Sequence, residues 1–194
     1  MTKNTFLIIG LGNPGAEYRD NRHNAGFMVI DRLAIRLNAK GIKLQSKAIV
    51  TNAIYQENKL ILAKPQTYMN LSGHSIQGLA NFYKLALKSL LVAYDDLDLP
   101  LGTIRIRPGG GPGGQKGIAS AIERLGTKDF ARLRIGIGRP PGRMDPANYV
   151  LQDFSRIEIK MLSEILDLAA DAVMVFVTEG LDKAMNRFNG EIRE

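Results

Sequence analysis

Phe6-Leu7-Ile8-Ile9-Gly10-Leu11-Gly12-Asn13-Pro14-Gly15 is the stretch that decides the fold of this 194-residue chain. Residues 6–11 form an apolar run of the length of a buried strand, and the glycines end it in a turn. Helical periodicity follows over residues 25–37, where one face carries Phe27, Ile30, Leu33, Ala34 and Leu37. The chain therefore opens with a buried strand, a long turn and a helix, an order typical of α/β domains.

Strands and helices alternate along the rest of the chain. Strand patterns cover residues 48–55, 59–64, 90–94, 103–107 and 132–137. Helical patterns predict a helix capped by Ser72 and further helices over residues 117–125, 155–177 and 181–188. Residues 139–153, rich in Pro and Gly, predict a long surface segment. We expect an α/β fold with one three-layer domain over residues 1–194, in which helices cover both faces of a mixed twisted sheet, parallel at its centre and antiparallel at the hairpin 48–64.

Composition narrows the possible functions. The chain has no cysteine, which excludes disulfides and thiolate metal sites, and its net charge of +7 is typical of proteins that bind nucleic acids. The only apolar run near the start, Phe6–Ile9, is too short for a signal peptide or a membrane span. We therefore expect a soluble cytoplasmic protein with no membrane partner.

The turn Gly10–Gly15 matches the dinucleotide pattern G-x-G-x-x-G, but its surroundings do not. The predicted helix begins about ten residues after the turn, so its amides cannot meet a pyrophosphate there. Pro14 removes a further amide, and Asp31 lies inside the helix instead of ending a strand. The sequence predicts no nucleotide cofactor. The turn instead presents Asn13 at the carboxyl end of a strand, where α/β sheets bind their ligands.

A histidine and a carboxylate are expected at this same edge of the sheet. His23 lies in Asn21-Arg22-His23-Asn24, and Asp95 and Asp96 end the apolar run 90–94. A carboxylate that accepts one ring N–H fixes the tautomer of a histidine and lets its other nitrogen take a proton. A surface histidine and a solvated acidic turn are the alternative interpretation.

Three further groups could bind a substrate. Asn70 precedes a helix and could donate to a carbonyl or a water, although it could equally be a turn residue beside the cap. The glycine-rich loop 108–117 lacks the Walker lysine and hydroxyl, so it predicts a close approach to an extended substrate and no triphosphate site. Two arginine pairs occupy single faces of neighbouring strands and form either a phosphate clamp or a solvated surface: Arg105 with Arg107, and Arg132 with Arg134.

Together these motifs resemble those of the bacterial-type peptidyl-tRNA hydrolases, in the same order and over nearly the whole chain. The motifs are residues 10–15, 21–26, 69–73 (Met-Asn-Leu-Ser-Gly), 95–100 (Asp-Asp-Leu-Asp-Leu-Pro) and 132–138 (Arg-Leu-Arg-Ile-Gly-Ile-Gly). The resemblance implies a monomeric esterase without metal or cofactor. Its substrate would be peptidyl-tRNA, bound at the tRNA acceptor end and cleaved between the peptide C-terminus and the 3′-terminal ribose.

The resemblance also implies roles for individual residues. His23 would activate water, Asp95 would orient His23, and the amides of Asn13 and Asn70 would hold water and substrate. The expected substrate contacts are Tyr18, Tyr68, Met69, Asn70, Gln115 and Lys116. The expected tRNA phosphate contacts are Arg105, Arg107, Arg134 and Arg143.

One position departs from the family's pattern. Family members usually carry His-Asn after the paired glycines, where this chain has Gln115-Lys116. The departure keeps open a second class of function, a non-catalytic RNA-binding relative of the same fold. The presence of His23, Asp95, Asn13 and Asn70 together favours the enzyme, because loss of catalysis relaxes a base and its partner together.

Overall fold

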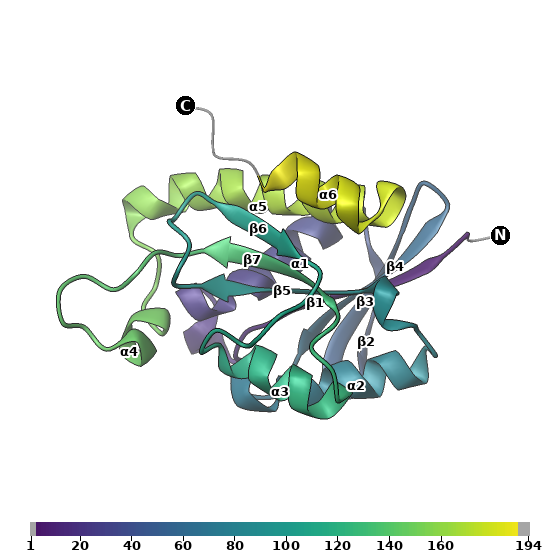
Figure 1. The fold of residues 1–194 in the computed structure, drawn as a ribbon, viewed down its shortest axis with the longest axis horizontal. Helices are drawn as coiled ribbons and strands as arrows, with labels where there is room; N and C mark the ends of the chain where they lie inside the picture. The colour runs from purple at the N-terminus through teal and green to yellow at the C-terminus, as the bar shows by residue number, and fades with distance from the viewer. Residues whose placement is uncertain (1–2, 190–194) are drawn as a thin grey trace.

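A mixed sheet of seven strands forms the centre of the computed structural model, which describes residues 3–189 (Figure 1). The strands are β1 (Thr5–Gly10), β2 (Lys40–Gln45), β3 (Ala48–Tyr55), β4 (Asn58–Pro65), β5 (Leu90–Asp96), β6 (Ile104–Arg107) and β7 (Ala131–Gly136). They lie in the order β2-β3-β4-β1-β5-β7-β6. The four central strands run parallel, and antiparallel pairing joins β2 and β3 at one edge and β6 at the other.

Helices cover both faces of this sheet. They are α1 (Ala25–Arg36), α2 (Ser72–Phe82), α3 (Lys116–Leu125), α4 (Pro146–Val150), α5 (Arg156–Glu179) and α6 (Leu181–Phe188). Figure 1 shows α2 and α3 below the sheet, α5 and α6 above it, and α4 extending to one side. Helix α1 packs against α5, on the upper face.

Strand β1 explains why the fold is a three-layer one. Ile8 belongs to the core beneath α1 and α5, whereas Leu7 and Ile9 belong to the core against α2 and α3. Successive side chains of a strand point to opposite faces, so a strand covered on both sides must be apolar throughout. The uninterrupted apolar run at residues 6–9 is thus the direct signature of a central strand.

The predicted architecture is confirmed, and most element boundaries agree within two residues. The ends of the predicted domain, residues 1–2 and 190–194, lie outside the described residues. Two elements were missed. Strand β2 is a mostly exposed edge strand with no buried alternation, and α4 lies within the predicted surface segment.

The prediction that Ser72 caps α2 is wrong. A 3₁₀ turn, Met69–Leu71, runs directly into α2, so Ser72 already has helical backbone angles and Leu71 takes the cap position. The Ser72 hydroxyl is buried and has no hydrogen-bond partner in the described structure.

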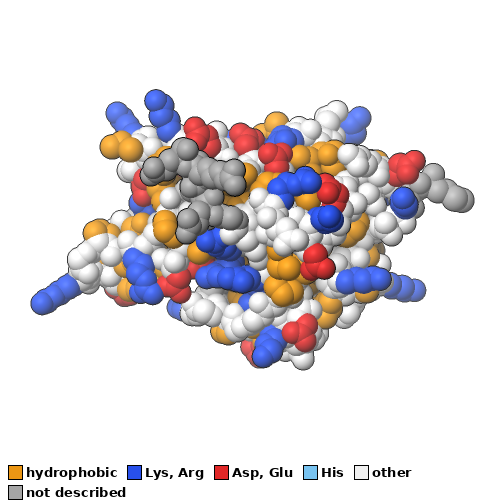
Figure 2. Space-filling model, turned by 45° about the horizontal axis from the view of Figure 1, so that its top comes forward, with side chains coloured by type: hydrophobic (Ala, Val, Ile, Leu, Met, Phe, Trp, Pro, Cys, Tyr) orange, Lys and Arg blue, Asp and Glu red, His pale blue; other side chains and the backbone are white. Residues whose placement is uncertain are grey.

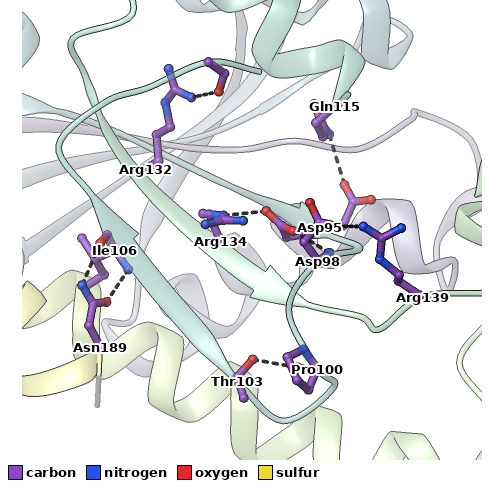
Figure 3. Close-up of polar contacts among 12 residues, drawn as sticks. Asp95, Asp98, Pro100, Thr103, Ile106, Gln115, Arg132, Arg134, Arg139 and Asn189 are labelled. Atoms are coloured by element: carbon purple, nitrogen blue, oxygen red, sulfur yellow. Dashed lines mark hydrogen bonds and ion pairs between the residues drawn. The ribbon is translucent and has the colours of Figure 1, made fainter. Parts of the chain in front are cut away.

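The outer edge of β6 is partly covered by Asn189, which directly follows α6. The side-chain amide of Asn189 donates to Ile106 O (2.8 Å) and accepts from Ile106 N (2.7 Å), as a neighbouring strand would (Figure 3). Such pairing satisfies an exposed strand edge. Within residues 3–189, none of the helices has the length and apolarity needed to cross a membrane.

Candidate active site

Close packing of two glycines brings the carboxyl ends of β1 and β5 together with the start of α1. A Cβ atom on Gly10 would collide with the carbonyl oxygen of Gly26, and one on Gly26 would collide with that of Ala93. Helix α1 can therefore begin directly against both strands. The 3₁₀ turn Arg22–Asn24, just before α1, is held at the same edge of the sheet.

His23 and Asp95 meet at this edge. The distance from His23 Nδ1 to Asp95 Oδ2 is 2.9 Å. The side chain of Asp95 is only 3% exposed and that of His23 12% exposed. A carboxylate can only accept, so Nδ1 carries the proton of the neutral imidazole and Nε2 is left as a proton acceptor. The predicted pair is present, with the tautomer that a general base requires.

Asn13 is fixed beside this pair by hydrogen bonds at both its backbone and its side chain. Its N–H donates to Asn24 Oδ1 (2.9 Å), and its carbonyl oxygen accepts from Asn24 Nδ2 (3.0 Å). The side-chain oxygen of Asn13 accepts from the N–H of Met69 (2.8 Å). Because this bond commits the oxygen, the Nδ2 group is the end of the amide available to a ligand.

A cleft of about 650 Å³ gathers most of the predicted site residues. Eight of them line it: Asn13, His23, Tyr68, Met69, Asn70, Asp95, Gln115 and Lys116. Tyr68, Asn70 and Lys116 are exposed, whereas Met69 is buried. Tyr18 and the four predicted phosphate contacts, Arg105, Arg107, Arg134 and Arg143, lie outside this lining.

The opposite wall of the cleft comes from the segment 139–154, hereafter the strap, and includes Asp145, Pro146, Ala147, Val150 and Leu151. The resemblance implies a lid or a tRNA contact for the segment after Arg139, but the helix α4 within it was not predicted. The signal was present in the sequence: Asp145 accepts from the N–H of Ala147 as an N-cap, and Pro146 occupies the first turn of α4. An acid followed by proline typically starts a helix.

Arg22, the neighbour of His23, clasps the strap. Only 6% of Arg22 is exposed, and its guanidinium donates to the carbonyl oxygens of Gln152 (3.2 Å) and Asp153 (2.7 Å). It also forms a two-pronged ion pair with Glu158 on α5 (2.8 and 3.0 Å) and lies 4.4 Å from the ring centre of Tyr149. The side-chain amide of Asn21 adds bonds to the same strap.

The same contacts set the charge state of Glu158. Burial alone would raise the pKa of its carboxyl group, but hydrogen bonds from Ser155 and from Arg22 outweigh it and lower the pKa. Glu158 also completes a capping box with Ser155 at the start of α5. One carboxylate therefore ties the helix, the strap and the segment that bears His23.

The arginines of β6 and β7 form cross-strand pairs, Arg105 with Arg134 and Arg107 with Arg132. Arg132 is 2% exposed and donates to backbone carbonyls of Gly110, Gly111 and Lys128, so the structure removes it from the predicted clamp. Figure 3 shows one of these bonds. Arg134 donates to Asp96 (2.5 Å), and this bond raises the pKa of the guanidinium. Asp96 is thus the partner of Arg134, and Asp95 that of His23. Arg107 is exposed.

Among residues 3–189, no three histidine or carboxylate side chains lie close enough together to hold a metal ion.

Comparisons with known proteins agree on one family. A sequence model of the family described as Peptidyl-tRNA hydrolase matches residues 7–194. The chain is 50% identical over 183 residues to "Peptidyl-tRNA hydrolase" of Desulfitobacterium hafniense, covering 94% of this chain and 98% of that one. It is 46% identical over 190 residues to the protein of the same name from Rhodococcus jostii, covering 97% and 100%. A crystal structure of peptidyl-tRNA hydrolase from Acinetobacter baumannii superposes with a TM-score of 0.90 at 35% identity, covering 98% and 97%.

Proposed function

This chain belongs to the peptidyl-tRNA hydrolase family and hydrolyses peptidyl-tRNA, and we propose that a water molecule activated by His23 performs the attack. The observation that carries the proposal is the 2.9 Å hydrogen bond between His23 Nδ1 and Asp95, at the floor of a cleft lined by two asparagines. The alternative of a non-catalytic RNA-binding relative is not favoured.

The proposed reaction begins with a proton transfer. Nε2 of His23 removes a proton from water as the water oxygen attacks the ester carbonyl carbon, and Asp95 stabilises the imidazolium that forms. The tetrahedral intermediate then expels the ribose oxygen. The imidazolium returns its proton to that oxygen, which restores the terminal hydroxyl of the tRNA, and the peptide leaves as a carboxylic acid that releases its proton to water.

The two asparagines supply the donors that this reaction needs. Asn13 has its amide oxygen committed to Met69 and offers Nδ2, which we assign to the attacking water. Asn70 is exposed on the turn before α2 and lines the same cleft, so we assign its amide to the substrate carbonyl. Donors fixed in this way stabilise charge as it develops on the carbonyl oxygen.

An ester suits this simple site. A ribose alkoxide leaves far more readily than an amine, so a single histidine can serve first as base and then as acid. General acid–base catalysis of this kind contributes about 10²- to 10⁴-fold in rate.

We assign the tRNA phosphates to Arg105, Arg107, Arg134 and Arg143. The net charge of +7 supports an electrostatic contribution to binding. On the face shown in Figure 2, however, basic side chains alternate with acidic ones, so total charge does not locate the tRNA path. Specific arginines must therefore be tested one at a time. We further propose that the enzyme acts as a monomer, because residues of this one chain line the cleft on both sides. We also propose that it acts in the cytoplasm.

The chain contains two histidines, which gives a matched test of the base. His74 lies on α2 and bonds to Leu71 O, outside the cleft lining. Release of tRNA from N-acetyl-aminoacyl-tRNA should fall about 10²- to 10⁴-fold in His23→Ala, with tRNA binding retained, and should stay unchanged in His74→Ala. Wild-type turnover by His23→Ala would refute the proposal.

A further inference from the structure

Gln115 links the catalytic carboxylate to the start of α3. Its Nε2 group donates to Asp95 Oδ1 (3.1 Å), as Figure 3 shows, and lies 3.3 Å from Met69 Sδ. Its Oε1 atom accepts from the N–H of Ile118 (2.8 Å) and caps α3. Both ends of this amide are therefore used within the protein.

These partners allow only one orientation of the amide. The Ile118 N–H can only donate, and an ionised Asp95 can only accept. A flipped amide would place two donors together at the helix and two acceptors together at Asp95. The Gln115 donor is thus held on Asp95 by the helix cap, without any substrate bound.

The buried carboxylate of Asp95 needs a hydrogen-bond donor at Oδ1. Its carboxylate is almost completely buried, and His23 reaches only one of its two oxygens, Oδ2. A buried charge is costly unless its oxygens are hydrogen-bonded. With His23 on Oδ2 and Gln115 on Oδ1, the carboxylate cannot rotate without losing a bond.

We propose that Gln115 is a positioning residue for the reaction and that it holds the Asp95 carboxylate with Oδ2 turned toward His23. This inference rests on the proposed role of His23 as the base. It replaces the sequence-based expectation that Gln115 contacts the substrate, because the Gln115 amide is already occupied. Lys116, exposed on the rim of the same cleft, is left as the substrate contact on this wall.

The choice of glutamine has a chemical consequence. A histidine here, as in the family's usual pattern, could also donate to Asp95, but it would gain and lose a proton in the working pH range. Glutamine does not titrate. The donor on Asp95 is therefore present at every pH, and His23 is left as the one histidine in the network.

Two substitutions distinguish the role of Gln115 in positioning Asp95 from its role in capping α3. Gln115→Met removes the bonds to Asp95 and to the Ile118 N–H. We expect kcat to fall about 10- to 100-fold, which is the usual effect of losing a group that orients a catalytic residue. KM should change less than about twofold, because Gln115 does not contact the substrate. Gln115→Glu keeps an acceptor for Ile118 but turns an acceptor toward Asp95. Its kcat should also fall, and the deficit relative to wild type should narrow as pH is lowered, because a proton shared by the two carboxylates restores a donor.

Gln77→Met and Gln77→Glu are the matched controls, since Gln77 donates to Arg124 O on α3, does not line the cleft and should leave both constants unchanged. An increase in KM at constant kcat in Gln115→Met, or a deficit in Gln115→Glu that does not vary with pH, would overturn the proposal. Should Gln115→Met not fold, Gln115→Glu decides alone, because its cap is intact. If His23→Ala is inactive while Gln115→Met matches wild type, the role of Gln115 is refuted and the role of His23 as the base stands. If His23→Ala is active, both proposals are refuted.

Discussion

The two walls of the cleft are held in place by different forces. On the α3 side, Gly117 packs so closely that a Cβ atom would lie 2.6 Å from Met69 Sδ, and Gly73 packs against the backbone of Ser120. On the strap side, α4 is a helix of five residues with exposed neighbours, held by hydrogen bonds from Arg22 and Asn21 and by the buried side chains of Tyr149, Val150 and Phe154. One wall is fixed by close backbone packing, and the other by buried polar bonds together with a few apolar side chains.

We therefore expect the packed wall to determine the rate of the reaction and the strap to determine the shape of the cleft. The catalytic groups stand on the closely packed wall and at the ends of central strands, where the backbone geometry does not depend on any one polar bond. A buried guanidinium supplies two of the hydrogen bonds that hold the strap, and that guanidinium is adjacent to His23 in the sequence. Polar changes on the packed wall should therefore alter rate alone, whereas loss of Arg22 should alter the fold of the strap and, through it, the cleft.

Replacement of Asp95 should have the largest effect on the packed wall. Asp95→Asn keeps the shape but offers an amide to His23, which favours the wrong tautomer, so kcat should fall roughly 10²- to 10⁴-fold with little change in melting temperature. Hydrolysis of N-acetyl-aminoacyl-tRNA and thermal unfolding measure the two quantities.

Asp96→Asn is the matched control for this change. It weakens the bond to Arg134 but leaves His23 and its partner untouched. Similar losses of kcat in the two variants would show that Asp95 has no special role, and the distinction between the two neighbouring acids would fail.

Replacement of Arg22 should have the largest effect on the strap. Arg22→Ala leaves Glu158 without its partner and frees two strap carbonyls, so the free energy of unfolding should fall on the order of 3 kcal/mol. Amide hydrogen exchange should rise first at residues 149–154. Arg22→Lys should recover only part of this, because an ammonium group cannot pair in two-pronged fashion or stack on Tyr149.

Arg36→Ala provides the comparison. Arg36 also pairs with an acid on α5, Asp171, but that pair is exposed and should contribute less than about 1 kcal/mol. Equal destabilisation by the two alanine variants would contradict the proposal that Arg22 holds the strap. So would unchanged amide hydrogen exchange in the strap of Arg22→Ala.

Most of the fold could be predicted because its signals are local. The apolar run of β1, the helical stripe of α1 and the last helix each follow from residues close together in sequence. Strand β2 gave no signal because it is a solvent-exposed edge strand, whose pairing with β3 is decided by tertiary contacts. The cap at Ser72 was misread because the preceding 3₁₀ turn shifts the helix start.

The site could be predicted less completely. Asn13, His23 and Asp95 follow from the rule that strand ends meet at one edge of a sheet, and the structure brings them together. The clasp by Arg22 could not be predicted, because it joins residues more than a hundred positions apart. Nor could the burial of Arg132, since alternation places it on the same face as Arg134 without showing that backbone carbonyls cover it.

The smallest effects are expected for the arginines assigned to tRNA phosphates. One of them lies on the sheet and one in the strap, so their variants compare the two regions directly. Arg107 lies on β6 and Arg143 in the strap, and both are exposed. Alanine at either position should raise KM several-fold at constant kcat and reduce the slope of log KM against log salt by about one, since one phosphate contact is lost. Arg187→Ala, an exposed arginine on α6 that pairs with Glu179, removes the same charge as a control and should leave the slope unchanged. If Arg107→Ala changes the slope and Arg143→Ala does not, the tRNA runs along the sheet and the strap serves the peptide alone.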